Sequence, residues 1–285
     1  MSSIAIITDT DSSLSPQKAN ELNIIQVPIK IHFEGETYNA VTEIDDARVF
    51  ERIDHEGKLP TTSAPSPGDF AAAYQTALER GAEGVVCFTV SGAVSATFEA
   101  ALAGKEMVED GPIEVVDSRS LSMGQGYMVM KAAELALAGA AKDEIVAAAA
   151  DIRERSYLFA ALSTLKYMAM SGRVGHLTAG MANFFNIKPI LTIQDGKLDL
   201  LEKVRTKSKS WQRLIELTRG ALSGREIEVL SILHVAAPDD AREFEALLRE
   251  HLECPDHIEY FELTPGLSIH AGAGLVGLTF VTSGN

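Results

Sequence analysis

Short apolar runs alternate with longer alanine-rich segments through the first half of the chain. Three runs have the continuous β-branched character of strands buried on both faces, at residues 4–8, 84–90 and 113–116. The segments between and after them have the length and composition of helices, at residues 69–80, 97–108, 125–137 and 143–153. This alternation predicts an α/β domain in which helices wrap a parallel sheet.

The first of these helices has clear boundary signals. Ser66 can cap its amino end, and Pro67 suits the first turn. Phe70 and Tyr74 then fall on one face before Gly81 ends the helix. We therefore predict a structural role for this segment.

The pattern changes from about Tyr157. Two apolar segments, 189–194 and 197–204, flank Asp195-Gly196, a pair typical of a tight turn between antiparallel strands. The later predicted elements are helices at 209–222 and 239–252 and strands at 227–235, 257–263 and 275–282. The chain is therefore predicted to consist of an N-terminal α/β domain, residues 1–156, and a C-terminal α+β domain, residues 157–285.

The charge of the chain limits its partners. The formal net charge is -15 over 285 residues, whereas nucleic acids and anionic membranes bind cationic surfaces. We therefore expect no nucleic-acid partner. The two cysteines, Cys87 and Cys254, are too few for a disulfide framework and are expected to be reduced structural thiols.

The ends of the chain give no sign of export or membrane insertion. The first apolar run has no basic segment before it and soon meets Asp9 and Asp11, unlike a secretory signal. The longest stretch without charged residues, 263–285, is broken by Pro265 and several glycines, so a spanning helix is not expected. We expect a cytoplasmic protein without stable membrane insertion.

A polar cluster, Thr8 to Ser13, follows the first predicted strand and contains Asp9 and Asp11. Two acids two residues apart at the end of a strand can bind Mg²⁺ or serve as nucleophile and acid, as in haloacid-dehalogenase phosphatases. Such enzymes also need a lysine and a second acidic pair, and Asp239-Asp240 follows Pro238, where a helix start accounts for it better. A Mg²⁺-dependent phosphatase that uses Asp9 and Asp11 is one hypothesis, and turn and capping roles are the other.

The sequence of residues 272–277 matches the glycine pattern of a dinucleotide-binding motif, but its sequence context does not match. That motif needs a following helix and an acidic residue about 20 positions later, but this chain ends at Asn285. We expect the glycines to let the backbone approach a neighbouring strand or a ligand. No other nucleotide, metal or nucleophile motif occurs, so we predict no cofactor, no metal site and no catalytic residue.

Two hydroxyl-rich turns remain as candidate anion sites. Thr61, Thr62 and Ser63 follow Pro60, and Ser91, Ser95 and Thr97 lie between a predicted strand and the next predicted helix. Hydroxyls and free backbone N–H groups at helix starts suit a carboxylate or a phosphate. Ordinary helix capping is the alternative for each turn.

Several basic side chains also have two interpretations. His270 is either a structural histidine or an anion contact, and Arg173 and Arg205 lie in loop-like contexts. The stretch with Lys203, Arg205, Lys207 and Lys209 is unusual in so acidic a chain. It is either a solvated face or a docking patch for an acidic or phosphate-bearing partner.

The order and spacing of these motifs resemble those of the DegV family over nearly the whole chain. The matching segments are residues 8–14, 60–67, 91–98, 116–118, 122–126, 172–173, 186–191 and 270–274. The resemblance implies an N-terminal α/β and a C-terminal α+β domain that hold a long-chain fatty acid near the cleft between them. It also implies that an ATP-binding fatty-acid kinase subunit is the partner and that this chain has no active site of its own.

The family resemblance assigns the candidate residues to roles. It implies that the head group is held by the hydroxyls of Thr61, Thr62, Ser63, Ser91, Ser95 and Thr97, and that Arg173, Arg205 and His270 lie near the head group and the docking face. Apolar side chains near these motifs can line the acyl chain, namely Met123, Met168, Met170, Phe184, Phe185, Leu267 and Ile269. The chain departs from the family at Ala96, Ser171 and Ala273, which occupy positions where the family has glycine, glycine and proline.

Overall fold

The computed structural model describes residues 3–109, 111–171 and 187–284. The chain forms two compact units, the first from residues 1–45 and 60–154 and the second from residues 46–59 and 155–285. The break at 154/155 lies close to the predicted boundary at 156/157. The assignment of residues 46–59 to the second unit has no counterpart in the predicted division.

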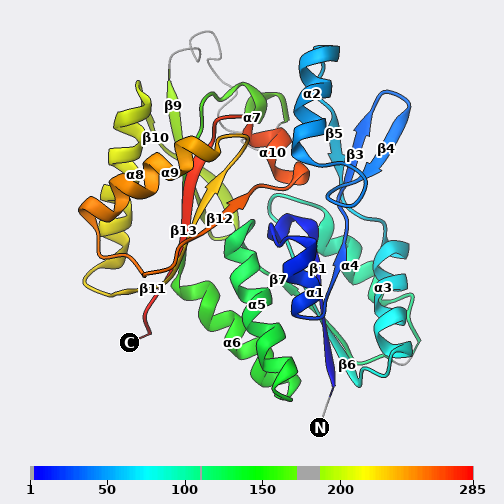
Figure 1. Ribbon diagram of the computed structural model, residues 1–285. Coiled ribbons are helices and arrows are strands. Elements are labelled where there is room, and N and C mark those ends of the chain that lie inside the picture. The colour runs from blue at the N-terminus through cyan, green and yellow to red at the C-terminus, as the bar shows by residue number, and fades with distance from the viewer. Residues whose placement is uncertain (1–2, 110, 172–186, 285) are drawn as a thin grey trace. The chain divides into compact units, whose positions relative to one another are not determined.

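The first unit is built on a four-stranded sheet in the order β2-β1-β6-β7, in which every neighbouring pair is parallel (Figure 1). Its strands are β1 (Ile4–Asp9), β2 (Ile24–Val27), β6 (Gly84–Thr89) and β7 (Ile113–Asp117). The predicted parallel sheet is therefore confirmed. The sequence prediction missed β2, which has only four residues and only two of them buried.

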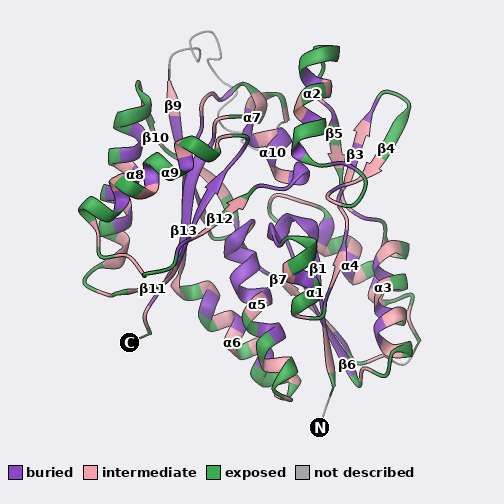
Figure 2. Ribbon diagram, viewed as in Figure 1, coloured by how far each residue is buried: buried purple, intermediate pink, exposed green. Residues whose placement is uncertain are grey.

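Helices cover this sheet. They are the short 3-10 helix η1 (Thr10–Ser12), α1 (Pro16–Glu21), α3 (Pro67–Glu79), α4 (Thr97–Lys105), α5 (Met123–Leu137) and α6 (Lys142–Arg155). Helices α3 and α4 pack Phe70, Tyr74 and Ala101 against one face of the sheet, and all six residues of β6 are buried. Figure 2 shows the same burial along the first two turns of α5, which packs on β1. Ser66 caps α3 as predicted, in a reciprocal capping box with Asp69.

A second, smaller sheet in this unit is antiparallel and was not predicted. It has the order β4-β3-β5, from β3 (Lys30–Phe33), β4 (Glu36–Asn39) and β5 (Thr61–Ser63). These strands have only three or four residues, too few for alternation to separate them from loops in the sequence. The predicted Thr61–Ser63 turn is therefore wrong, because these residues form a strand.

The second unit contains a six-stranded sheet in the order β10-β9-β8-β13-β11-β12, antiparallel except for the β11–β12 pair. Its strands are β8 (Ser156–Ala161), β9 (Lys188–Gln194), β10 (Lys197–Val204), β11 (Ile227–His234), β12 (Glu259–Glu262) and β13 (Val276–Thr282). Asp195 and Gly196 both have positive φ, 50° and 77°, between β9 and β10. The predicted hairpin is thus confirmed.

The helices of this unit are α2 (Asp46–Glu56), α7 (Lys166–Ser171), α8 (Lys207–Leu222), α9 (Pro238–His251) and α10 (Pro265–Ala271). Helices α8 and α9 bury Trp211, Leu214 and Phe244 in one apolar core with Phe280 of β13. Every residue of β13 is buried, as Figure 2 shows. The α+β prediction is confirmed, whereas α2, α7 and α10 were not predicted. None of the helices described is both long and apolar enough to cross a membrane.

Candidate functional site

The three hydroxyls of β5 do not point the same way. Successive side chains of a strand alternate between its two faces. Pairing with β3 places Thr62 opposite Ile31, which is completely buried, whereas Ser63 lies opposite Lys30. Thr62 therefore shares the apolar face of the small sheet, and Thr61 and Ser63 share its polar face, so the expected convergence of all three on one head group is not supported.

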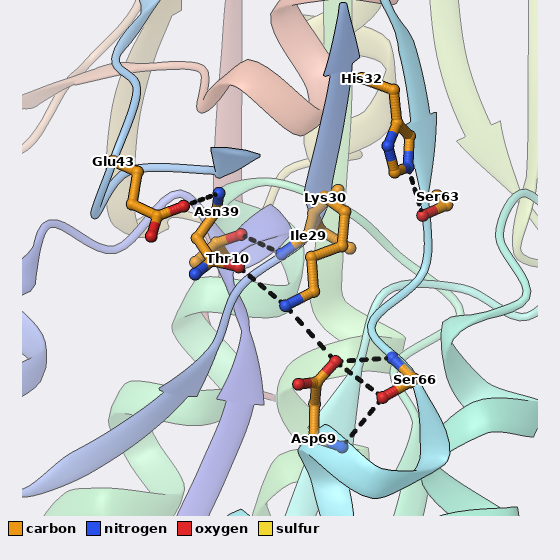
Figure 3. Close-up of polar contacts among 9 residues, drawn as sticks. All are labelled: Thr10, Ile29, Lys30, His32, Asn39, Glu43, Ser63, Ser66 and Asp69. Carbon is orange, nitrogen blue, oxygen red and sulfur yellow. Dashed lines mark hydrogen bonds and ion pairs between the residues drawn. The ribbon is translucent and has the colours of Figure 1, made fainter. Parts of the chain in front are cut away.

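The polar face carries a hydrogen-bond network that the sequence did not reveal. His32 bonds to two hydroxyls, with Nδ1 2.9 Å from Thr37 Oγ1 and Nε2 2.8 Å from Ser63 Oγ. Figure 3 shows the His32 ring directed at Ser63. Lys30 donates to Asn39 Oδ1 at 2.7 Å and lies 3.4 Å from Asp69 Oδ2, the carboxylate of the α3 capping box. Ser63 is thus held by its neighbours on this face.

The second set of hydroxyl side chains, Ser91, Ser95 and Thr97, lies between the end of β6 and the first residue of α4. Ser91 and Thr97 are completely buried, and Ser95 Oγ lies 2.7 Å from Thr97 Oγ1. The hydroxyls of Ser95 and Thr97 therefore lie within hydrogen-bonding distance of each other. Ala96 is exposed and has an ordinary backbone conformation, with φ of -76°, so its methyl group replaces the family's glycine without backbone strain.

Asp9 connects two strands of the parallel sheet. Its carboxylate is completely buried, and Oδ2 accepts the Val90 N–H at 2.7 Å while Oδ1 accepts the Asp11 N–H at 2.9 Å. Burial is the largest influence on this group and raises the pKa of Asp9 to about 6. The Asp9 side chain thus links the carboxyl ends of β1 and β6 through hydrogen bonds.

The phosphatase hypothesis is not supported by this arrangement. Both oxygens of Asp9 accept bonds from the backbone, which is the turn and capping role that the sequence left open. Asp239 and Asp240 lie in the first turn of α9 after Pro238, where acidic residues favour a helix start. In the described ranges, no group of three or more His, Cys, Asp or Glu side chains is placed to hold a metal ion.

Asp9→Asn should lower the free energy of unfolding by about 1–3 kcal/mol, because the amide group has one acceptor oxygen where two backbone donors need acceptors. The folded protein binds a proton at Asp9 more tightly than the unfolded chain, so the contribution of Asp9 to stability is full below pH 3.8 and is lost as the pH rises through about 6. Urea denaturation should therefore show a larger cost at pH 5 than at pH 8. Asp54→Asn, on an exposed position of α2, is the control, and equal costs for Asp9→Asn at both pH values would contradict the raised pKa.

His270 lies in α10, and the loop after this helix is held closely by its surroundings. Ser163 Oγ donates to the Ala273 carbonyl at 2.5 Å, and the Gly274 N–H donates to the Val235 carbonyl at 2.8 Å. A Cβ atom at Gly277 would lie 2.7 Å from the Phe159 carbonyl oxygen of β8. The expectation that these glycines permit close approach of a neighbouring strand is therefore confirmed at Gly277.

The basic stretch is not uniformly available to a partner. Lys207 lies 2.9 Å from Asp240 and 3.4 Å from Glu243, and its ammonium lies 4.5 Å from the centre of the Trp211 ring. Lys207 is thus engaged within its own unit. Arg205 is exposed between β10 and α8. Arg173 lies outside the described residues.

The side chains predicted to line an acyl chain have different environments. Met123, Met168 and Ile269 are buried, Leu267 is half-buried, and Met170 is 59% exposed. Phe184 and Phe185 lie outside the described residues. Two cavities of about 370 and 330 Å³ are lined by other residues, the first around the amino ends of β1 and β2 and the second between α8 and α9.

Several of the described side chains carry groups that can donate hydrogen bonds to an anion. The hydroxyls of Thr62, Ser95 and Thr97 in the first unit, and separately the imidazole of His270 in the second, are groups that can donate a hydrogen bond to a carboxylate. The thiol of Cys87 is buried, and burial raises its pKa to about 12, so this cysteine is not a nucleophile in the folded protein.

The chain is similar to known proteins over nearly its whole length. The family described as "Uncharacterised protein, DegV family" matches residues 3–283. A DegV domain-containing protein of Halalkalibacterium halodurans is 31% identical over 280 residues, which are 98% of this chain and 99% of that protein. A DegV family protein of Thermus thermophilus, solved in a study of its fatty acid binding, has a TM-score of 0.89 at 27% identity and coverage of 98% and 99%. A fatty acid binding DegV family protein of Streptococcus agalactiae has a TM-score of 0.89 at 25% identity, with both chains fully covered at 100%.

Proposed function

This chain belongs to the DegV family, and from that premise we propose that it binds one long-chain fatty acid and holds its carboxylate with hydroxyl groups. The solved relatives from Thermus thermophilus and Streptococcus agalactiae, which are described as fatty acid binding, support the ligand class. Burial favours such a ligand, because each methylene group withdrawn from water contributes about 0.8 kcal/mol.

The observation that carries the proposal is the position of Thr62. Its side chain lies on the same face of the small sheet as Ile31, so a hydroxyl group lies beside a buried apolar side chain. A fatty acid needs this combination, a few polar groups at one end of an apolar environment. Ser95 and Thr97, whose hydroxyls lie 2.7 Å apart, are the other proposed contacts in this unit.

Mass spectrometry of organic extracts from the purified protein tests the proposal directly. Native mass spectrometry of the same sample counts the ligands on each chain. We expect one fatty acid per chain, and its mass gives the chain length and saturation. A protein that is empty after purification and also takes up no added palmitate or oleate would refute the proposal.

Thr62→Val should weaken fatty acid binding by about tenfold, because valine keeps the shape of threonine but removes the hydrogen bond to the carboxylate, a change of about 1.4 kcal/mol. Thr61→Val is the matched control, since it makes the same chemical change on the opposite face of β5. The measurement is displacement of a fluorescent fatty acid at equilibrium. Equal losses for the two variants would contradict the assignment of Thr62.

We further propose that the bound carboxylate is presented to a separate ATP-dependent kinase subunit, which transfers the γ-phosphoryl group to a carboxylate oxygen and releases ADP. The family resemblance and the exposed positions of Lys203 and Arg205 in an acidic chain support this step. Reversal of charge at Lys203 and Arg205 together should abolish acyl-phosphate formation with the kinase while fatty acid binding is retained, and unchanged coupling would exclude this patch.

A further inference from the structure

Helix α10, which carries His270, is held on one side by α2 from a distant part of the chain. Asp46, the first residue of α2, accepts a hydrogen bond from Ser268 Oγ at 2.5 Å, across a separation of 222 residues. Both side chains are buried, with 5% of Asp46 and none of Ser268 exposed. A short bond to a carboxylate in such surroundings is among the strong hydrogen bonds of proteins.

The remaining contacts of α10 show why this bond matters. The helix has only seven residues, which is too short to be stable by itself, so its position depends on its neighbours. On one side the ring of Tyr167 from α7 packs on Gly272, and Ser163 bonds to Ala273. These contacts fix the carboxyl end of α10, whereas the bond from Ser268 to Asp46 fixes its middle.

We propose that Asp46 is a positioning residue for His270. Ser268 lies two residues before His270, so a shift of α10 away from Asp46 changes the place and direction of the imidazole. Asp46 therefore acts on the ligand through Ser268 and α10 and does not contact the ligand itself. This inference rests on the proposed function and on the place near the head group that the family resemblance implies for His270.

The variants separate positioning from folding. Asp46→Ala removes the acceptor and should weaken palmitate binding by about tenfold, which corresponds to about 1.4 kcal/mol. Asp46→Asn keeps an oxygen acceptor at the same place and should bind palmitate within about twofold of the wild type, since one neutral hydrogen bond replaces a charge-assisted one. Ser268→Ala removes the donor and should resemble Asp46→Ala. Asp54→Ala makes the same substitution on the exposed side of α2 and should change nothing.

The second readout is the pair of ¹⁵N chemical shifts of the His270 imidazole, assigned by comparison with His270→Gln. We expect these shifts to change in Asp46→Ala and Ser268→Ala and to return toward the wild-type values in Asp46→Asn. Should Asp46→Ala fail to fold, Ser268→Ala provides the same test from the other side of the bond.

The two readouts also separate the two hypotheses. If the wild type binds palmitate but Ser268→Ala and Asp46→Ala change neither the affinity nor the His270 shifts, Asp46 is not a positioning residue. If the wild type binds no fatty acid, the proposed function fails, and the imidazole shifts still decide whether Asp46 positions His270.

Discussion

Phe280→Ala should lower the free energy of unfolding by about 3–5 kcal/mol, the cost typical of removing a buried phenylalanine ring. Phe280 is completely buried in β13, the strand between β8 and β11 in the larger sheet. Its ring stacks on Tyr157 with 5.2 Å between ring centres and packs on Phe159 at 6.3 Å. The alanine variant would leave a cavity in the centre of this core.

Urea denaturation followed by tryptophan fluorescence measures this effect, because the single tryptophan, Trp211, lies in the same core. Phe280→Leu is the matched control and should cost less than the alanine variant, since leucine fills most of the volume. A loss below about 1 kcal/mol for Phe280→Ala would show that the core collapses around the missing ring, contrary to the close packing that we describe.

Gly272→Ala should lower the free energy of unfolding by about 2–4 kcal/mol, from backbone strain and a steric clash together. Gly272 has φ of 80° and ψ of 156°, a conformation that residues with a side chain rarely adopt. An added Cβ atom would also lie 2.2 Å from Cδ2 of the Tyr167 ring, so this ring would have to move. Because α10 ends at this position, we expect weaker fatty acid binding as well.

Two comparisons separate the strain from the clash. Gly81→Ala introduces a methyl group at positive φ, 94°, where no other atom lies within 4 Å, so it carries strain alone. Combining Gly272→Ala with Tyr167→Ala should cost less than the sum of the two single substitutions, because the ring is no longer in the way. Purely additive costs would show that Tyr167 does not constrain Gly272.

The sequence predicts the elements of this fold best where burial gives a long periodic pattern. The helix after Ser66 and the hairpin at Asp195-Gly196 were predicted because their capping and turn residues act locally. The three-stranded sheet was missed because its pairing depends on contacts between residues distant in sequence, such as Lys30 with Ser63. Helix α2 was not predicted, although Asp45, a residue type that favours the start of a helix, directly precedes it.

The residue types of the candidate site could be predicted from the sequence, but which of these side chains lie close together could not. Ser95 and Thr97 are close together, as their spacing suggested, whereas Thr62 and Ser63 point to opposite faces once their segment is known to be a strand. Asp46 carries no local signal, since its partner Ser268 lies far along the chain, and one of the two partners of His32, Ser63, is also distant. The sequence also left a phosphatase role open for Asp9 and Asp11, because the Val90 N–H that donates to Asp9 lies 81 residues away and gives no local signal.

Residues 46–59 belong to the second unit although they precede most of the first unit in the chain, and this order matters while the protein is being translated. Helix α2 leaves the ribosome early, but Ser268, the partner of Asp46, is made roughly 10–40 s later at ordinary rates of translation. During that interval Val49 and Ile53, which are buried in the finished protein, have no core to enter. Helix α2 therefore gains its hydrogen bond to α10 only after the chain has been made as far as Ser268.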